Sequence, residues 1–469
     1  MSILTTLAGR TLTFLCIAIL SGYAFAQNHS SKLANTHEFQ LSNGMKVLVR
    51  EDHRAPTVAH MVWYRAGSID EVNGKTGVAH VLEHMMFKGT KNLKPGEFSK
   101  KVAAVGGRDN AFTSKDYTAY FQQIEKSHLP AMMALEADRM ANLQISKEEF
   151  AKEIQVVMEE RRLRTDDQSQ AIVYEQLMAT AFTNSPYRNP IIGWMDDLKN
   201  LTYQDALEWY RDWYAPNNAV LVVSGDVNPI EVLHQAEKYY GPIPARPIKE
   251  RKPQIEIPQI GTKRIMVKAP AESSDVTLAW KVPKIQPESL NDIEPYALSV
   301  LSAILDGHAN SRLNRQMVRD SRIADNVDAS YGMSGRGPQL FTISATPAKG
   351  NKVDLLEQRI KAILEEIKTN GVTDAELNRV KAQLVSSQIY KRDSIFAQAM
   401  EIAIAEINGI SWRYLDDMIL NVQKVQSTDI QKVVKQYLVD DQLTVAILDP
   451  QPIKKGSSPL RATPSGMRH

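Results

Sequence analysis

Residues 57–67 read TVAHMVWYRAG, and residues 77–89 read GVAHVLEHMMFKG. The first stretch predicts a β-strand and the second a helix with an apolar face. The same order recurs in the second half, where VTLAWKVP (276–283) precedes YALSVLSAILDG (296–307). Each helix closes with a glycine, as helix C-termini often do. The chain is therefore predicted to hold two diverged copies of one unit, and only the first copy carries histidines in this helix.

The elements around these copies indicate an α+β fold. FQLSNGMKVLVRE (39–51) predicts a hairpin around Asn43-Gly44, and AVLVVSGD (219–226) predicts a further strand. Strands and helices mix without strict βαβ alternation, which is typical of sheets packed against helix layers. We therefore predict two similar sheet-plus-helix domains, at residues 37–240 and 259–450.

The stretch between these domains is GPIPARPIKERKPQIEIP, residues 241–258, and it contains five prolines. Proline fixes φ and removes an amide donor, so this segment is expected to be an extended, stiff linker.

Composition excludes several classes of protein. The chain has 469 residues, of which 43% are apolar and 23% charged, and its formal net charge is +2. This balance gives no electrostatic basis for nucleic-acid binding and is unlike that of a disordered chain. A single cysteine, Cys16, excludes a disulfide framework, an iron–sulfur cluster and a thiolate zinc site.

The first 26 residues differ from the rest. Arg10 is their only charge, and TLTFLCIAILSGYAFA (11–26) is an apolar run that ends in Ala-Phe-Ala. This pattern predicts a cleaved secretory signal peptide, with a retained membrane anchor as the alternative. The run falls short of the roughly 20 residues needed to cross a bilayer. We expect an exported protein, periplasmic or secreted, without a membrane span in the mature chain, and disordered stretches at 27–36 and 451–469.

Candidate chemistry concentrates at His80-Val81-Leu82-Glu83-His84. On a helix, residues at i and i+4 lie on one face, so His80 and His84 could hold one Zn²⁺. Glu83 lies on the flank of that face, where it could contact a water molecule. This H-x-x-E-H arrangement inverts the commoner H-E-x-x-H metalloprotease motif. The alternative is a chance pair of core or surface histidines.

A catalytic zinc usually has three protein ligands, so a carboxylate partner is expected elsewhere. In the predicted helix KEEFAKEIQVVMEERRLR (147–164), Glu153 and Glu160 share a face with Val156 and Val157 between them, whereas Glu159 points elsewhere. Helical phase therefore favours Glu160 or Glu153 as the ligand. The alternative is a solvated acidic helix.

These motifs together resemble the pitrilysin family of zinc peptidases. GVAHVLEHMMFKGT is followed by a glutamate 76 residues after His84, in VVMEERR, and the resemblance extends to LSNGMKVLV, YRNPIIGW and YAPNNAVLVVSGDV, covering about residues 37–450. The resemblance implies a pair of similar α+β domains of the bacterial exported type. It also implies that His80, His84 and Glu160 bind one zinc ion per chain, that Glu83 is the general base, and that Glu153 supports the site as a second carboxylate.

The resemblance further implies an endopeptidase. The segment Asn110-Ala111-Phe112 is similar to the family's edge strand, to which the substrate pairs through main-chain hydrogen bonds. Such pairing needs an extended chain, so the expected substrates are unfolded or flexible peptides.

One departure from the family concerns the second domain. Members that act alone place an Arg and a Tyr, seven residues apart, after an S-R-L sequence, which is Ser311-Arg312-Leu313 here. The corresponding positions are Val318 and Asp325, while Arg319 and Tyr331 lie 12 apart. Either this segment is out of register, or a related subunit supplies the pair in a hetero-oligomer; a homodimer is the other assembly considered. The alternative to an enzyme is a non-catalytic binding or assembly subunit that keeps the fold.

Overall fold

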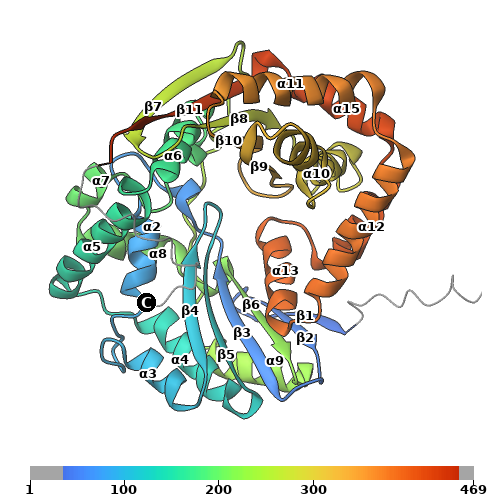
Figure 1. Cartoon of the computed structure of the whole chain (residues 1–469). Coiled ribbons are helices and arrows are strands. Elements are labelled where there is room, and N and C mark those ends of the chain that lie inside the picture. The colour runs from blue at the N-terminus through green and yellow to red at the C-terminus, as the bar shows by residue number, and fades with distance from the viewer. Residues whose placement is uncertain (1–34, 454–469) are drawn as a thin grey trace, which may run out of the picture.

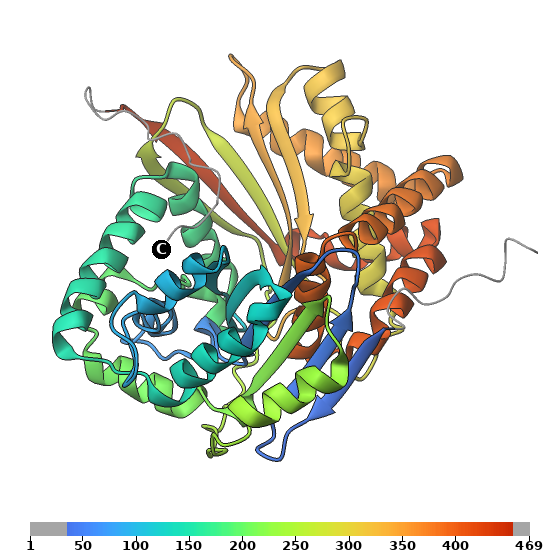
Figure 2. The same ribbon diagram turned by 90° about the horizontal axis from the view of Figure 1, so that it is seen from below.

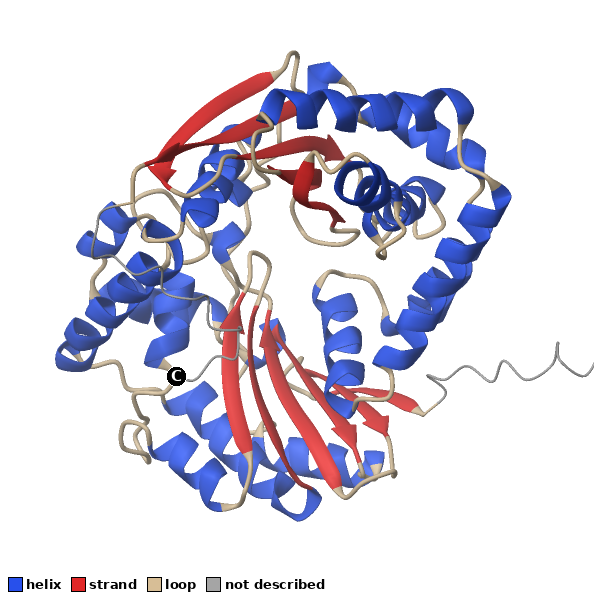
Figure 3. Cartoon of the chain, viewed as in Figure 1, coloured by secondary structure: helices blue, strands red, loops and turns tan. Residues whose placement is uncertain are grey.

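The computed structural model describes residues 35–453. The predicted signal peptide lies outside this range, as do most residues of the two stretches expected to be disordered. Within the described residues, no helix is long and apolar enough to span a membrane. The protein contains two mixed sheets, each lying between layers of helices (Figures 1 and 3). This architecture confirms the predicted α+β class.

The first sheet has six strands in the order β1-β2-β6-β3-β5-β4. The predicted hairpin is formed by β1 and β2, and β2 then runs parallel to β6. The strands are β1 (Thr36–Gln40), β2 (Lys46–Glu51), β3 (Thr57–Tyr64), β4 (Arg108–Thr113), β5 (Thr118–Glu125) and β6 (Ala219–Gly225). The helices are α2 (Val78–Met85), α3 (Glu97–Ala104), α4 (Leu129–Asn142), α5 (Lys147–Arg161), α6 (Ser169–Ala181), α7 (Met195–Asn200), α8 (Tyr203–Trp213) and α9 (Pro229–Tyr239).

The second sheet has five strands in the order β7-β11-β8-β10-β9. Its strands are β7 (Lys263–Pro270), β8 (Asp275–Val282), β9 (Ala324–Tyr331), β10 (Gln339–Pro347) and β11 (Leu443–Gln451). Its helices are α10 (Ile293–Asp306), α11 (Val353–Asn370), α12 (Asp374–Lys391), α13 (Ile395–Ile407), α14 (Leu415–Lys424) and α15 (Ser427–Tyr437).

The two sheets share one topology. The order β2-β6-β3-β5-β4 in the first corresponds to β7-β11-β8-β10-β9 in the second, with the same single parallel pair and the same antiparallel pairs. Strand β1 is the only addition in the first sheet. This agreement confirms the predicted duplication.

The two domains exchange helices across their sheets. Helix α6, from the first half of the sequence, packs on β7 and β11 of the second sheet, and α13, from the second half, packs on β3 and β6 of the first. Figure 2 shows the green helices of the first domain on one side of the second sheet and the yellow and orange helices on the other. Along β3, Val58 and Val62 therefore face the first domain's own core, whereas Met61 and Trp63 face the core shared with α13.

Residues 241–258 contain no helix or strand. One side chain of this segment, Glu256, joins both domains. Its carboxylate accepts hydrogen bonds from the backbone N–H groups of residues 183–185, each at 2.9 Å, and from Lys281 Nζ of β8 at 2.6 Å. A second link joins Asp70 to Arg336 through two hydrogen bonds of 2.6 and 2.7 Å.

Candidate metal centre

Helix α2 carries both histidines of the motif, and all of its residues are buried. It begins after Gly77, whose φ of +87° lies in the left-handed region. A Cβ at Gly77 would lie 2.5 Å from Ile192 O and 2.9 Å from Gly193 Cα. The backbones of the two motifs, GVAHVLEH and YRNPIIGW, are therefore in direct contact, and this contact requires glycine.

Three candidate ligands converge at one point. His84 Nε2 lies 3.3 Å from Glu160 Oε2, and His80 Nε2 lies 3.8 Å from the same oxygen. All three ligand atoms lie within 4.8 Å of one another. Metal–nitrogen bonds of about 2.0–2.1 Å in a tetrahedral zinc site place neighbouring ligand atoms about 3.3 Å apart. Two imidazoles and one carboxylate at these separations fit a zinc ion.

Helix α5 brings two carboxylates to this centre. Glu160 faces both histidines, while Glu153, two turns earlier, accepts a hydrogen bond from His84 Nδ1 at 2.9 Å. Lys88 Nζ lies 2.6 Å from the other oxygen of Glu153. Glu159 points away, with its side chain 58% exposed and paired with Arg162, as helical phase predicts. Of the two valines between these glutamates, Val157 is buried but Val156 is 50% exposed. The face of α5 that carries Glu153 and Glu160 is therefore less buried than the sequence predicted.

The charges at the centre favour a cation. Burial would lower the pKa of His84, but its hydrogen bonds to Glu153 and Glu160 outweigh this effect and raise the pKa to about 9. Burial would likewise raise the pKa of Glu160, yet the hydrogen bond from His84 and the charges of His80 and Arg164 hold it at about 2. The carboxylates thus create a negative potential at the imidazoles, and the same potential attracts a metal ion.

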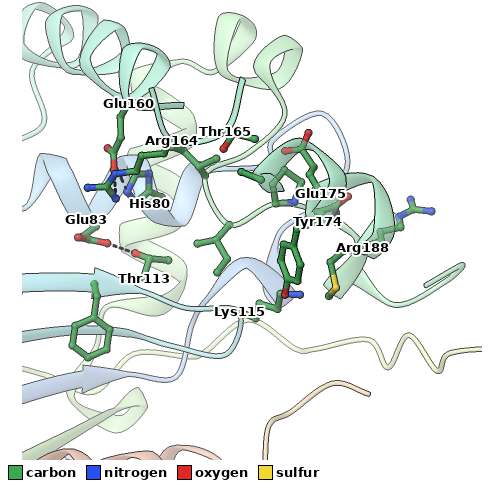
Figure 4. A pocket seen from close by; sticks show the side chains of 17 residues that line it. His80, Glu83, Thr113, Lys115, Glu160, Arg164, Thr165, Tyr174, Glu175 and Arg188 are labelled. Atoms are coloured by element: carbon green, nitrogen blue, oxygen red, sulfur yellow. Dashed lines mark hydrogen bonds and ion pairs between the residues drawn. The ribbon is translucent and has the colours of Figure 1, made fainter. Parts of the chain in front are cut away.

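Glu83 lies beside the three candidate ligands without joining them. Thr113 Oγ1, at the end of β4, donates a hydrogen bond of 2.5 Å to Glu83 Oε2 (Figure 4). Burial raises the pKa of Glu83 to about 7, and the hydrogen bond from Thr113 only partly offsets it. Glu83, His80 and Glu160 line one pocket of about 320 Å³, so the carboxylate and the ligands face the same space.

Strand β4 forms the edge of the first sheet next to this pocket. Ala111 is buried, and its N–H donates to the side chain of Asn110 at 2.9 Å. Phe112 and Thr113 line the pocket that contains Glu83, whereas Asn110 lines a larger pocket of about 1100 Å³ that contains His84 and Glu153. The predicted substrate segment therefore runs between two pockets that meet at the metal centre.

Comparison with known proteins identifies the family. The family model described as "Insulinase (Peptidase family M16)" matches residues 46–194, and the one described as "Peptidase M16 inactive domain" matches residues 200–384. The "Zinc protease PqqE" of Helicobacter pylori is 32% identical over 440 residues, covering 91% of this chain and 95% of the relative. The chain belongs to peptidase family M16. The resemblance to pitrilysin-type peptidases is thereby confirmed.

Solved M16 structures show the same fold. A protease from Helicobacter pylori superimposes with a TM-score of 0.84 at 31% identity, covering 88% of this chain and 99% of the other. The periplasmic protease PqqL from Escherichia coli shares the fold with a TM-score of 0.76 at 19% identity. This M16 chain covers 48% of PqqL, so PqqL is about twice as long as the matched unit.

Three residues of the M16 site went unnoticed in the sequence. Arg164 pairs with Glu160, four residues before it, and this i,i+4 spacing is a signal that could have identified it. Lys88, which follows the end of α2, pairs with Glu153 of α5, and no local spacing links these two residues. Thr113, which contacts Glu83, follows the expected substrate segment directly. Nothing local in the sequence links it to α2.

In the second M16 domain, the residues at and near the expected Arg and Tyr positions do not line this centre. Val318 packs partly buried against the core of its own domain, and Asp325 is exposed on β9. Arg319 donates to the side chain of Asn310, and the Tyr331 hydroxyl donates to Pro283 O at 2.6 Å. All residues that line the two pockets at the centre lie between His80 and Ile192. In the part of the chain that the structure describes, the second domain contributes no side chain to either pocket.

Proposed function

We propose that this protein is a zinc-dependent endopeptidase in which His80, His84 and Glu160 hold one zinc ion per chain. The observation that carries the proposal is the convergence of three ligand atoms within 4.8 Å, beside a buried carboxylate that faces the same pocket. Membership of the M16 family supports it. When bound, zinc supplies a Lewis acid that makes water acidic near neutral pH and polarises a carbonyl group.

In this proposal Glu83 is the general base. Its carboxylate takes a proton from the attacking water and passes it to the leaving amine. Thr113 holds one carboxylate oxygen and so orients the group towards the pocket. Glu153 is a positioning residue, because its hydrogen bond to His84 Nδ1 leaves Nε2 directed at Glu160 and the metal.

The proposed substrates are unfolded or extended peptides. Strand β4 pairs with β5 on one side only, so its other edge can pair with a peptide strand. Residues 110–112 would hold the peptide main chain, and the pockets on either side would receive its side chains. A folded domain cannot present such a strand without local unfolding.

We further propose that the chain is the zinc-bearing half of a larger enzyme. Among the residues that the structure describes, both pockets are lined by the first domain alone, and the positions expected to hold Arg and Tyr are Val318 and Asp325. A related subunit that supplies the Arg/Tyr pair would complete the site, and a homodimer is the second arrangement. The length of PqqL, about twice the matched unit, is consistent with two such units working together. The signal-like sequence at residues 1–26 supports export, to the periplasm or beyond.

The test uses purified residues 27–469 and a mixture of unstructured fluorogenic peptides, with and without a candidate partner. We expect one zinc per chain and cleavage that Glu83→Gln abolishes while zinc is retained. Glu148→Gln, a change at an exposed glutamate of α5 that lines neither pocket, is the matched control and should cleave normally. Zinc binding without cleavage in any arrangement would favour a non-catalytic binding or assembly subunit, as the "inactive domain" description of residues 200–384 allows. Full turnover by Glu83→Gln would refute the assignment of the base.

A further inference from the structure

The pocket that contains Glu83 is also lined by a lysine, Lys115, that forms no ion pair with any residue the structure describes. Much of its wall is apolar, including Phe112, Tyr174, Met178 and Ile192. Lys115, in the turn between β4 and β5, lines the same pocket. Figure 4 shows Lys115 beyond Thr113, on the side of Tyr174 and Arg188 rather than beside His80.

The carboxylates of this pocket already have other partners. Glu160 pairs with Arg164 at 2.5 Å, and Glu175 pairs with Arg161 at 2.8 Å. Glu83 lies next to the metal ligands and accepts from Thr113. None of these carboxylates forms an ion pair with Lys115.

Lys115 is held by neutral groups instead. Its Nζ donates to Tyr187 O at 3.0 Å and lies 4.7 Å from the centre of the Tyr187 ring. The carboxylate of Asp116, the next residue, accepts from the Tyr187 hydroxyl at 2.6 and 2.7 Å, and its backbone oxygen accepts from Arg336 of the second domain at 3.1 Å. The charge of Asp116 raises the pKa of Lys115, but burial outweighs this effect. Lys115 forms no ion pair with any residue that the structure describes. Burial lowers the pKa of Lys115 to about 8, so the side chain remains mostly protonated at neutral pH.

Arg188, a second cation that lines this pocket, is only half-buried. Arg188 donates to Thr183 O at 3.0 Å and to Asn73 Oδ1 at 3.4 Å, and it too forms no ion pair with a described residue. A cation in a partly apolar pocket is costly unless an anion compensates it. Lys115 therefore places a positive charge on the wall of the pocket that also contains Glu83, whereas the guanidinium of Arg188 donates to residues outside the pocket lining.

We propose that Lys115 binds a carboxylate of the substrate and makes this pocket selective for an acidic group next to the scissile bond. The inference rests on the proposed peptidase function and goes further by naming the chemistry of the preferred substrate. Two carboxylates could fill the role: an Asp or Glu side chain, or the C-terminal carboxylate of a short peptide.

The experiment uses the zinc-loaded protein, with its partner where activity needs one, and peptides that carry Gln at each position around a mapped cleavage site. Each Gln is replaced in turn by Glu, and each peptide is made with a free or an amidated C-terminus. The quantity compared is the ratio of kcat/KM between the acidic and neutral peptide of each pair. The glutamate series reports on a side chain, and the amidated series reports on the C-terminus.

We expect one position, or the free C-terminus, to give a ratio of about 10 or more, because a hydrogen bond to a charged group at a buried site is strong. Lys115→Met should bring this ratio below about 2, while Lys115→Arg and the surface control Lys152→Met keep it. If Lys115→Met shows no cooperative thermal unfolding and so is not folded, Lys115→Gln is used in its place. A wild-type ratio near 1 at every position, or an unchanged ratio in Lys115→Met, would overturn the inference.

The same peptides are bound to the Glu83→Gln variant and followed by fluorescence anisotropy. This arm needs no turnover, so it separates the two proposals. Acid-selective binding that Lys115→Met removes, without cleavage by the wild type, would count against the peptidase function and support the carboxylate site. Cleavage without any acid selectivity in rate or binding would support the peptidase function and count against the carboxylate site.

Discussion

Replacing Glu153 by Gln tests whether this residue positions the metal ligand His84. Glu153 Oε1 accepts from His84 Nδ1 at 2.9 Å, and its other oxygen lies 2.6 Å from Lys88 Nζ. The amide keeps the shape of the side chain but removes the charge that fixes the imidazole and increases its basicity. Loss of such a partner typically weakens metal affinity about 10–100-fold. This loss corresponds to about 1.4–2.7 kcal/mol of binding free energy.

The assay is competition between the protein and a chelator of known zinc affinity, with Glu159→Gln as the matched control. Glu159 lies on the same helix, but its side chain is 58% exposed and pairs only with Arg162, so its replacement should leave zinc affinity unchanged. An affinity of Glu153→Gln within about twofold of the wild type would refute the positioning role. A complete loss of zinc would instead indicate that Glu153 is itself a ligand.

Two further predictions concern stability. Burial would raise the pKa of Glu256, but the hydrogen bonds from Lys281 and residues 183–185 lower it from 4.5 to about 2. The carboxylate therefore stabilises the fold above pH 4.5, and this contribution is lost as the pH falls towards 2. Glu256→Gln should lower the free energy of unfolding by about 1–3 kcal/mol at pH 7 and by roughly half as much or less at pH 3, as urea titrations would measure. An equal loss at both pH values would contradict this prediction. Gly77→Ala should lower the Tm by several degrees more than Gly74→Ala. Both residues have positive φ, but the new Cβ would lie 2.5 and 2.9 Å from backbone atoms at position 77 and would meet no atom within 4 Å at position 74. Equal shifts in Tm would show that this close approach is unimportant.

Much of this architecture could be predicted because the hydrophobic periodicity of a helix or strand depends only on residues that are close in the sequence. Helical phase placed His80 and His84 on one face of α2 and excluded Glu159 as a metal ligand. The structure brings Glu160 and Glu153 to the same centre as the two histidines. The choice between these two glutamates as ligand depended on family resemblance, since both share one face of α5. The repeated strand–helix pattern predicted the duplication, which the matching strand orders confirm.

The features that escaped prediction depend on contacts between distant segments. An apolar helix face does not identify the surface that will cover it, so the exchange of α6 and α13 between the domains was not foreseen. The contact of Gly77 with Gly193 and the hydrogen bonds from residues 183–185 to Glu256 join residues separated by 70 or more positions. Lys115 is an ordinary turn lysine in the sequence, and only the fold places it in the pocket beside Glu83.

The central claim is that one zinc ion binds to His80, His84 and Glu160. A crystal structure of the zinc-loaded protein, with anomalous difference maps on both sides of the zinc absorption edge, tests it most directly. We predict one anomalous peak per chain, within bonding distance of His80 Nε2, His84 Nε2 and Glu160 Oε2. A peak bonded to Glu153 in place of Glu160, or a zinc-loaded crystal whose only peaks lie elsewhere, would contradict the account.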